Sequence, residues 1–284
     1  MTEASGQAQP KHLADSLFAS KRYFEASIEY QRAIFNQPAP GLLAKARYQK
    51  ALCYRHLGRY EDALKELNQI GLFSLEDSLK TGVLYEKAFN LMLSEDHSEA
   101  LMNIQRIREK QLPQTTRHNL QPLKIIILNN NRQWQKAEQT FRNWIASHTL
   151  NNDEKAGWKD TLSLLYSEDN LPKNYSQETA RNWSRFIPGA GHAYAGHPWE
   201  GAASFLLNGA AIGLGIHQIW KGYYFTAYVA GFGVFYKTYF GGMERAANLA
   251  SLEKENEMEA FNKKCARLIQ KIIQHQSTHH TKSH

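Results

Sequence analysis

The stretch "RFIPGAGHAYAGHPWEGAASFLLNGAAIGLGIHQIW", residues 185–220, decides between two folds, because it begins like a glycine-rich phosphate loop and continues like a membrane span. A dinucleotide-binding fingerprint needs a strand before its glycines and an acidic residue about 20 positions beyond them. The preceding "SQETARNWSRFI" has no strand pattern, and no Gly-Lys-Ser/Thr triplet follows as a Walker loop requires. The nucleotide-binding interpretation is therefore disfavoured.

The membrane interpretation fits this stretch better. Residues 201–220 contain no Asp, Glu, Lys or Arg, and a helix of this length is about 30 Å long, the thickness of a hydrocarbon core. After Lys221 and Gly222, a second apolar run, "YYFTAYVAGFGVFY", is completed by "TYFGG" beyond Lys237. So short a turn predicts an antiparallel hairpin of two spans. Aromatic residues suited to headgroup depth gather at both ends: Trp220, Tyr223, Tyr224, and Tyr194, Trp199, Tyr236, Tyr239.

Small residues within the two runs predict that the helices approach closely. Gly209 and Gly213 form one small-xxx-small step, and Ala227 and Gly231 form another. Asn208 is a polar position in the first run, as is His217. We expect an interhelical hydrogen bond or an interfacial contact for these two, rather than a transport role. A soluble domain with a buried helical pair remains the alternative.

The glycine-rich start of this stretch resembles a family of small bacterial membrane domains with two short spans. These domains open with a motif like Pro-Gly-x-Gly-x-x-Tyr-x-Gly, matched here by Pro188, Gly189, Gly191, Tyr194 and Gly196. The resemblance covers about residues 187–242, and His192 stands where Gln is common. It implies a location, the bacterial inner membrane, rather than an activity. In members joined to repeats, the repeat region is often exported.

The first half of the chain carries a repeat of 37 residues. Ala26, Ala63, Ala100 and Ala137 each follow a turn at this interval. Large or apolar residues recur four and seven positions later: Tyr30, Leu67, Ile104, Phe141, and Ala33, Ile70, Ile107, Trp144. This spacing places all of them on one helix face. A preceding helix is visible in "LLAKARYQKALCYRHLG" and "SLKTGVLYEKAFNLMLS", so we expect stacked helix pairs.

The segments "KRYFEASIEYQRAIFNQP" and "GRYEDALKELNQI" resemble the tetratricopeptide repeat (TPR) family, with weaker copies at 97–107 and 134–145. The resemblance covers roughly residues 11–150, and "DEKAGWKDTLSLLYSE" is the expected closing helix; an unrelated helical bundle is the alternative. The family implies a solenoid whose first helices line a groove for a protein or peptide partner. The groove residues it implies are Lys45, Tyr48, Gln49, Arg55, Tyr85, Glu86 and Phe89.

Charge and topology both bear on location. The net charge of +7 suits an anionic membrane surface. Nucleic acid is disfavoured as a partner, because the sequence has no stripe of Arg and Lys interleaved with aromatic residues. Against Lys221 at the turn, the base of the hairpin has four cations: Arg181, Arg185, Lys237 and Arg245. The positive-inside tendency places the repeats in the cytoplasm. The polar start "MTEASGQAQP" agrees if Met1 is the natural start, whereas a removed signal peptide makes the repeats periplasmic.

The remaining segments complete the predicted domain plan. Residues 243–275 are expected to form an amphipathic helix, which docks on the repeats, pairs with another copy or lies on the membrane. Its apolar stripe comprises Leu249, Leu252, Met258, Phe261, Cys265, Leu268 and Ile272. The other expected parts are a disordered N-terminus at 1–10, repeats at 11–170, a linker at 171–186, the hairpin at 187–242 and a disordered tail at 276–284.

No catalytic motif is visible, so we expect no catalytic residues, no metal site, no cofactor and no enzyme. The two cysteines, Cys53 and Cys265, are expected to be free thiols. The predicted fold is all-α: a TPR-like helical-hairpin solenoid, a two-helix transmembrane hairpin and an amphipathic helix. The predicted function is a membrane-anchored scaffold for protein–protein interaction, as in envelope assembly. The alternative is a small oligomeric membrane element, associated through the hairpin, that aids transport or membrane-protein insertion.

Overall fold

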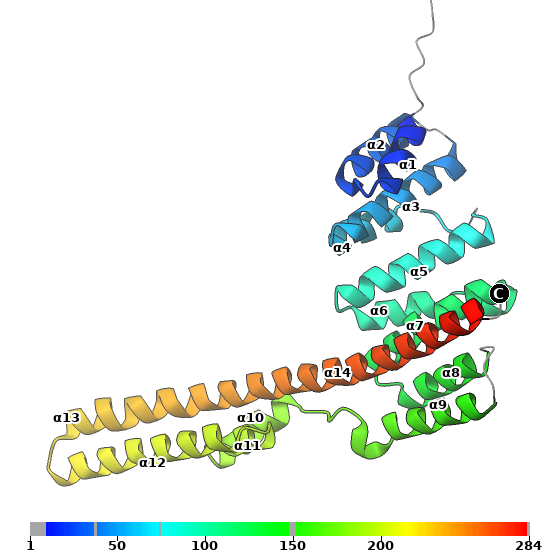
Figure 1. Ribbon diagram of the computed structural model, residues 1–284. Coiled ribbons are helices and arrows are strands. Elements are labelled where there is room, and N and C mark those ends of the chain that lie inside the picture. The colour runs from blue at the N-terminus through cyan, green and yellow to red at the C-terminus, as the bar shows by residue number, and fades with distance from the viewer. Residues whose placement is uncertain (1–9, 37–38, 74, 148–151, 283–284) are drawn as a thin grey trace, which may run out of the picture. The chain divides into compact units, whose positions relative to one another are not determined.

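The computed structural model describes residues 10–36, 39–73, 75–147 and 152–282, and every regular element in these ranges is helical (Figure 1). The prediction of an all-α protein is confirmed. The expected disordered N-terminus lies almost entirely outside the described residues. The chain forms two compact units: unit 1 comprises Met1–Ser163 with Ile272–His284, and unit 2 comprises Leu164–Lys271.

Unit 1 is built from helices that pack in chain order. Its elements are α1 (Pro10–Ala19), α2 (Tyr23–Asn36), α3 (Pro40–His56), α4 (Tyr60–Asn68), α5 (Asp77–Leu93), α6 (His97–Gln105), η1 (Glu109–Gln111), α7 (Gln114–Asn130), α8 (Trp134–Ala146) and α9 (Asn152–Leu165). The helices α3, α5 and α7 begin 37 residues apart and each has 17 residues. The starts of α2, α4, α6 and α8 follow the same interval. The period of the sequence is therefore a period of the structure.

The residues predicted to share one helix face form the core of unit 1. Ala26, Ala63, Ala100 and Ala137 are all fully buried, each at the fourth position of its helix. The residues four and seven positions later are buried too. A small residue lets the neighbouring helix approach, and the larger side chains fill the remaining space.

One left-handed residue recurs before each second helix of a pair. Lys21, Gly58, Glu95 and Arg132 have φ values of 59°, 73°, 65° and 54° and stand 37 residues apart. The amide that follows each one donates to the carbonyl five residues earlier, at 2.9–3.0 Å: Arg22 to Leu17, Arg59 to Tyr54, Asp96 to Leu91, and Gln133 to Leu128. This is the Schellman arrangement that ends a helix. The chain thus reverses direction in the same way four times.

Unit 2 contains a helical hairpin. Its elements are η2 (Glu168–Asn170), α10 (Gln177–Phe186), α11 (Ala190–Tyr194), α12 (Pro198–Trp220), α13 (Tyr224–Thr226), the π-helix η3 (Ala227–Gly233) and α14 (Val234–Lys282), whose last residues belong to unit 1. After the turn at Lys221–Tyr223 the chain returns along α12, and α10 and α11 lie at the opposite end of the hairpin (Figure 1). Ala180, Ala195, Ala246, Leu249 and Ala250 form a core at that end.

The structure differs from three predicted boundaries. The expected linker at 171–186 contains α10, which is capped because the amide of Thr179 donates to Ser176 Oγ at 3.3 Å. No break separates the hairpin from the amphipathic helix, and α14 extends to Lys282 through the expected disordered tail. No Gly or Pro occurs between residues 243 and 282 to end the helix.

The predicted apolar stripe of α14 is correct except at one position. Leu249, Phe261, Cys265, Leu268 and Ile272 are buried and Met258 is partly buried, but Leu252 is exposed. Within unit 2, Tyr166 packs edge-on against Phe261, with ring centroids 5.4 Å apart.

Candidate functional sites

Three of the seven predicted groove residues line a cavity in unit 1. Lys45, Tyr48 and Gln49 project from α3 into a space of about 460 Å³. The other lining residues come from α1, α2, α3 and α5 and the segment before α5: Asp15, Tyr30, Ala46, Glu76, Ser78, Leu79 and Gly82. Because a Cβ on Gly82 would lie 3.1 Å from the Tyr48 hydroxyl oxygen, the glycine makes room for this ring. The cavity is lined by both polar and apolar groups, among them charges of both signs.

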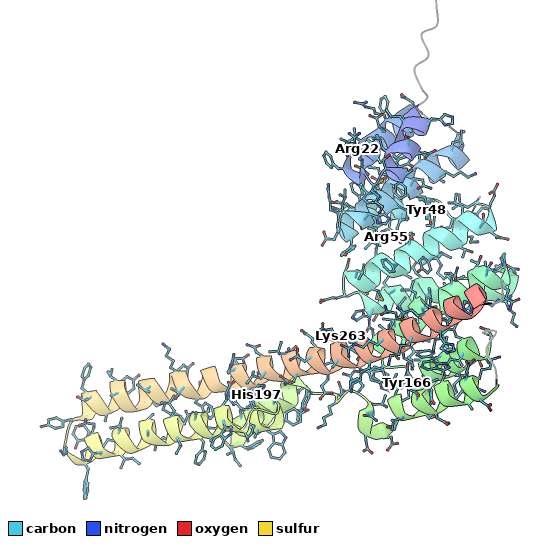
Figure 2. The ribbon with its side chains drawn as sticks, in the orientation of Figure 1. Arg22, Tyr48, Arg55, Tyr166, His197 and Lys263 are labelled. Carbon is cyan, nitrogen blue, oxygen red and sulfur yellow. The ribbon has the colours of Figure 1, made fainter. Side chains whose placement is uncertain are left out.

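The other four predicted groove residues form an internal cluster between α3 and α5. Arg55 Nη1 donates to both carboxylate oxygens of Glu86, at 2.8 and 3.1 Å. The Arg55 guanidinium also lies 5.3 Å from the ring centroid of Phe89, which stacks on Tyr85. Glu86 is buried, so its carboxylate serves the ion pair rather than a ligand in solution. Figure 2 labels Tyr48 and Arg55 on α3.

Burial shifts the pKa both of Tyr48, in the cavity, and of Glu86, in the internal cluster. It raises the pKa of Tyr48 to about 12, and the nearby Glu86 carboxylate adds to the rise. The pKa of Glu86 is also raised, because loss of solvation outweighs the attraction of Arg55. Tyr48 therefore remains a neutral hydroxyl, able to donate or accept a hydrogen bond at physiological pH.

The apolar pattern did not predict a buried charge network in unit 1. Lys50 Nζ donates to Glu66 Oε1 at 2.7 Å and to Gln31 Oε1 at 2.6 Å, and Arg47 Nη1 donates to Glu66 Oε2 at 2.8 Å. Lys50 and Glu66 are both buried. These bonds join α2, α3 and α4. Nothing in the sequence separates these charges from those of an exposed helix face.

A second cavity, of about 560 Å³, was also not predicted. Its lining residues lie on η1, α7, α8 and the segment after α8: Glu109, Gln114, Arg117, His118, Gln121, Lys124, Thr140, Asn143, Trp144 and Ser147. The charged groups here hold η1 in place. Lys124 pairs with Glu109, and Arg117 donates to the carbonyl oxygens of Glu109 and Leu112 at 3.0 and 3.1 Å.

In unit 2, the glycines of the Pro-Gly-x-Gly-x-x-Tyr-x-Gly motif allow backbones to meet. Gly189, with a φ of 92°, is so close to α12 that a Cβ would lie 2.0 Å from the Gly201 carbonyl oxygen. A Cβ on Gly191 would lie 2.0 Å from the carbonyl oxygen of Ala180. Pro188 precedes this contact, and Gly196 (φ 87°) ends α11. The Tyr194 hydroxyl accepts from the amide of Ser176 at 3.1 Å.

Further along the hairpin, the two arms touch through small residues and one hydrogen bond. A Cβ on Gly231 would lie 2.5 Å from the Cα of Gly215 and 3.6 Å from the carbonyl oxygen of Ala211. The buried Asn208 Oδ1 accepts from Thr238 Oγ1 at 2.9 Å. This is the interhelical hydrogen bond that was one of the two roles expected for Asn208.

The predicted contact through Gly209 and Gly213 is wrong. A Cβ on either residue would meet nothing within 4 Å, and both residues are exposed. The buried face of α12 instead carries Asn208, Ala211 and the half-buried Gly215. Both sets have helical spacing, so glycine spacing by itself did not identify the inward face.

The outer surface of the hairpin is apolar. Trp199 and Trp220, near the two ends of α12, are 86% and 90% exposed. Between them, the large side chains are also exposed: Phe205, Leu206, Leu207, Ile212, Leu214, Ile216 and Ile219. Within the described part of the chain, α12 is the single helix whose length and apolar composition suit a membrane crossing.

Ion pairs tie together the end of the hairpin that carries α10 and α11. Arg181 pairs with Glu244 at 2.9 Å, and Arg245 pairs with Glu200 at 3.1 Å. His197, labelled in Figure 2, has its Nε2 3.3 Å from Glu253 Oε1.

In comparisons with known proteins, no family model, no curated protein and no solved structure matches the chain.

Proposed function

We propose that the chain is a membrane-anchored scaffold that holds a protein or peptide partner in a groove of TPR-like repeats. The observation that carries the anchor is the inverted arrangement of the hairpin. Its contact face holds Gly, Ala, Asn and Thr, whereas its large apolar side chains face outward. A soluble protein rarely exposes a continuous apolar surface of this kind, whereas lipid solvates it.

The dimensions and the polar groups of α12 support the same proposal. Its 23 residues correspond to roughly 34 Å at 1.5 Å per residue, enough to cross a bilayer. Trp220 then lies at the headgroup layer on the side of the turn. The hydrogen bond between Asn208 and Thr238 satisfies polar groups that hydrocarbon cannot. Because Asn208 is used in this way, the hairpin favours an anchor over a pathway for solutes.

We further propose that the returning arm, from α13 through η3 into the start of α14, is a second span. Its exposed side chains are large and apolar: Phe225, Tyr228, Val229, Phe232, Val234, Tyr236 and Phe240. Two spans put both ends of the hairpin on one side. That side carries Arg181, Arg185, Lys237 and Arg245, which favours the cytoplasmic face of a bacterial inner membrane.

The cavity lined by Lys45, Tyr48 and Gln49 is our proposed partner site. It offers an ammonium group, an amide and a neutral phenol, which suit a polar peptide segment. We propose that Arg55 and Glu86 hold α3 and α5 in register behind the site rather than contacting the partner. Tyr85 and Phe89 support that pair.

Two experiments in cells that naturally produce the protein test the proposal. Carbonate extraction of membranes is expected to leave the full chain in the pellet, and its release would exclude the anchor. For the groove, a photo-crosslinking amino acid at position 45 or 49 is expected to capture one defined partner. The same group at position 65, an exposed lysine on α4, is the matched control. Equal capture at all three positions would exclude the groove.

A further inference from the structure

We propose that the C-terminal end of α10 enters the headgroup layer beside the hairpin and that Arg185, with Lys237, binds the phosphates of anionic phospholipids. The inference rests on the proposed membrane anchor and adds a third contact with the bilayer, of stated lipid chemistry. The helix concerned, α10, lies within residues 171–186, which were predicted from the sequence to be a linker.

The exposed side of α10 is apolar where a soluble helix would be polar. Trp183, Phe186 and Ile187 are 53%, 82% and 51% exposed, at positions i, i+3 and i+4. They therefore share one face of the helix end. The opposite face is already used, since Ala180 and Ser184 are buried. Three large apolar groups thus lack a protein partner within the described part of unit 2 that would remove them from water.

Contacts with α14 set the direction and depth of α10. The Tyr239 hydroxyl donates to the carbonyl oxygen of Arg185 at 2.7 Å, whereas Arg181 pairs with Glu244. The later residue of α10 therefore meets the earlier residue of α14, so the two helices run antiparallel. The end of α10 lies level with Tyr239, inside the last turns of the proposed second span, so Arg185 and Lys237 reach the headgroups by extending their long side chains. The exposed apolar face is continuous in depth with the apolar surface of the hairpin.

The charges at this level complement a phosphate layer. Arg181 and Arg245 are neutralised by Glu244 and Glu200. No ion pair of Arg185 or Lys237 occurs among the residues that the structure describes, and both are exposed. A guanidinium group binds phosphate oxygens through paired donors, and a lysine near the end of a span extends its ammonium group to the interface. Two uncompensated cations beside exposed aromatics fit an anionic lipid surface.

Tryptophan fluorescence of the full chain in vesicles tests the proposal. Three variants each retain one tryptophan, Trp183, Trp220 or Trp158, with the others changed to Phe. Each is reconstituted in phosphatidylcholine that carries bromine at a shallow or a deep acyl position. Trp183 is expected to lose emission to shallow bromine more than to deep bromine. Trp220 reports the anchor, and Trp158, on α9 of unit 1, is expected to keep its emission.

The outcomes separate the two proposals. Quenching of Trp220 without quenching of Trp183 would overturn the α10 contact and leave the anchor in place, with another occupant covering α10. Loss of quenching at both would overturn the anchor itself. Equal quenching of Trp158 would mean that the probe does not report depth, and would count against the inference.

A second measurement tests the lipid chemistry. Adding phosphatidylglycerol to the vesicles is expected to shift Trp183 emission to shorter wavelength, and salt is expected to reverse the shift. The double variant Arg185→Gln/Lys237→Gln is expected to lose this dependence. Lys173→Gln/Lys254→Gln removes the same charge from exposed sites elsewhere in unit 2 and is expected to retain it. Equal loss in both variants would contradict a specific role for Arg185 and Lys237.

Discussion

Gly231 and Gly215 meet backbone to backbone in the hairpin, where a Cβ on Gly231 would lie 2.5 Å from the Cα of Gly215. Gly209, on the exposed side of α12, would meet nothing within 4 Å if it carried a Cβ. The same substitution at these two glycines therefore has opposite expected effects.

Gly231→Ala is expected to destabilise the hairpin by roughly 1–3 kcal/mol, because the added methyl group forces the helices apart. Gly209→Ala should be neutral or stabilising by up to about 1 kcal/mol, because alanine has the higher helix propensity. Titration of the full chain from a mild detergent into SDS, followed by circular dichroism, measures both. Equal destabilisation would show that the two arms do not meet at Gly231.

The left-handed turns of unit 1 give a second prediction. Glu95 adopts a φ of 65° and is exposed, so Glu95→Gly removes backbone strain without removing a buried contact. We expect thermal unfolding to show a gain of about 1 kcal/mol. Gly58→Ala, at the equivalent turn 37 residues earlier, should cost a similar amount. If Glu95→Gly instead lowers the stability, the Glu95 side chain must stabilise the fold by more than the left-handed backbone destabilises it.

The Arg55–Glu86 pair gives a third prediction. Arg55→Met leaves a buried carboxylate without its cation, which typically costs roughly 3–5 kcal/mol; the partial exposure of Arg55 favours the lower end. Replacing both partners, Arg55→Met with Glu86→Leu, should recover most of that loss. Chemical unfolding of both variants and the wild type measures the difference. A double variant no better than Arg55→Met would show that the buried charge is not the cause.

The raised pKa of Glu86 gives a prediction about pH. Its folded-state pKa lies above the ordinary value of 4.5, so its contribution to stability is present below pH 4.5 and is lost as the pH rises through the folded-state pKa. In Glu86→Gln this loss is absent. The unfolding free energy of the variant, relative to wild type, should therefore increase as the pH is raised from below 4.5 to neutrality. A decrease would mean that attraction to Arg55 outweighs burial.

The sequence was sufficient to predict the helical class, the 37-residue period and the buried residues of each second helix. A period of apolar residues reports directly which side of a helix is buried. It does not report backbone strain, so the left-handed conformations of Lys21, Glu95 and Arg132 were not predicted. The predicted end of α14 was also wrong, because a polar composition does not by itself end a helix.

The candidate sites were predicted less completely. Of the implied groove residues, three line the cavity and four form the internal cluster around the Arg55–Glu86 ion pair. The sequence could not distinguish these two sets, because the burial of Glu86 depends on its neighbours in three dimensions. The network of Lys50 and Glu66 and the second cavity depend on side chains from several helices. In the hairpin, Gly209 and Gly215 look alike in sequence, and only the rotation of α12 decides which of them meets Gly231.

In the proposed membrane hairpin, the hydrogen bond between Asn208 and Thr238 fixes how the two arms align. Sliding one arm past the other by a helical turn, about 5.4 Å, would leave an amide and a hydroxyl without a partner in hydrocarbon and bring residues that carry a Cβ into the glycine contact. The two arms of the hairpin therefore have a single favourable alignment, and the hairpin resists sliding of one arm along the other.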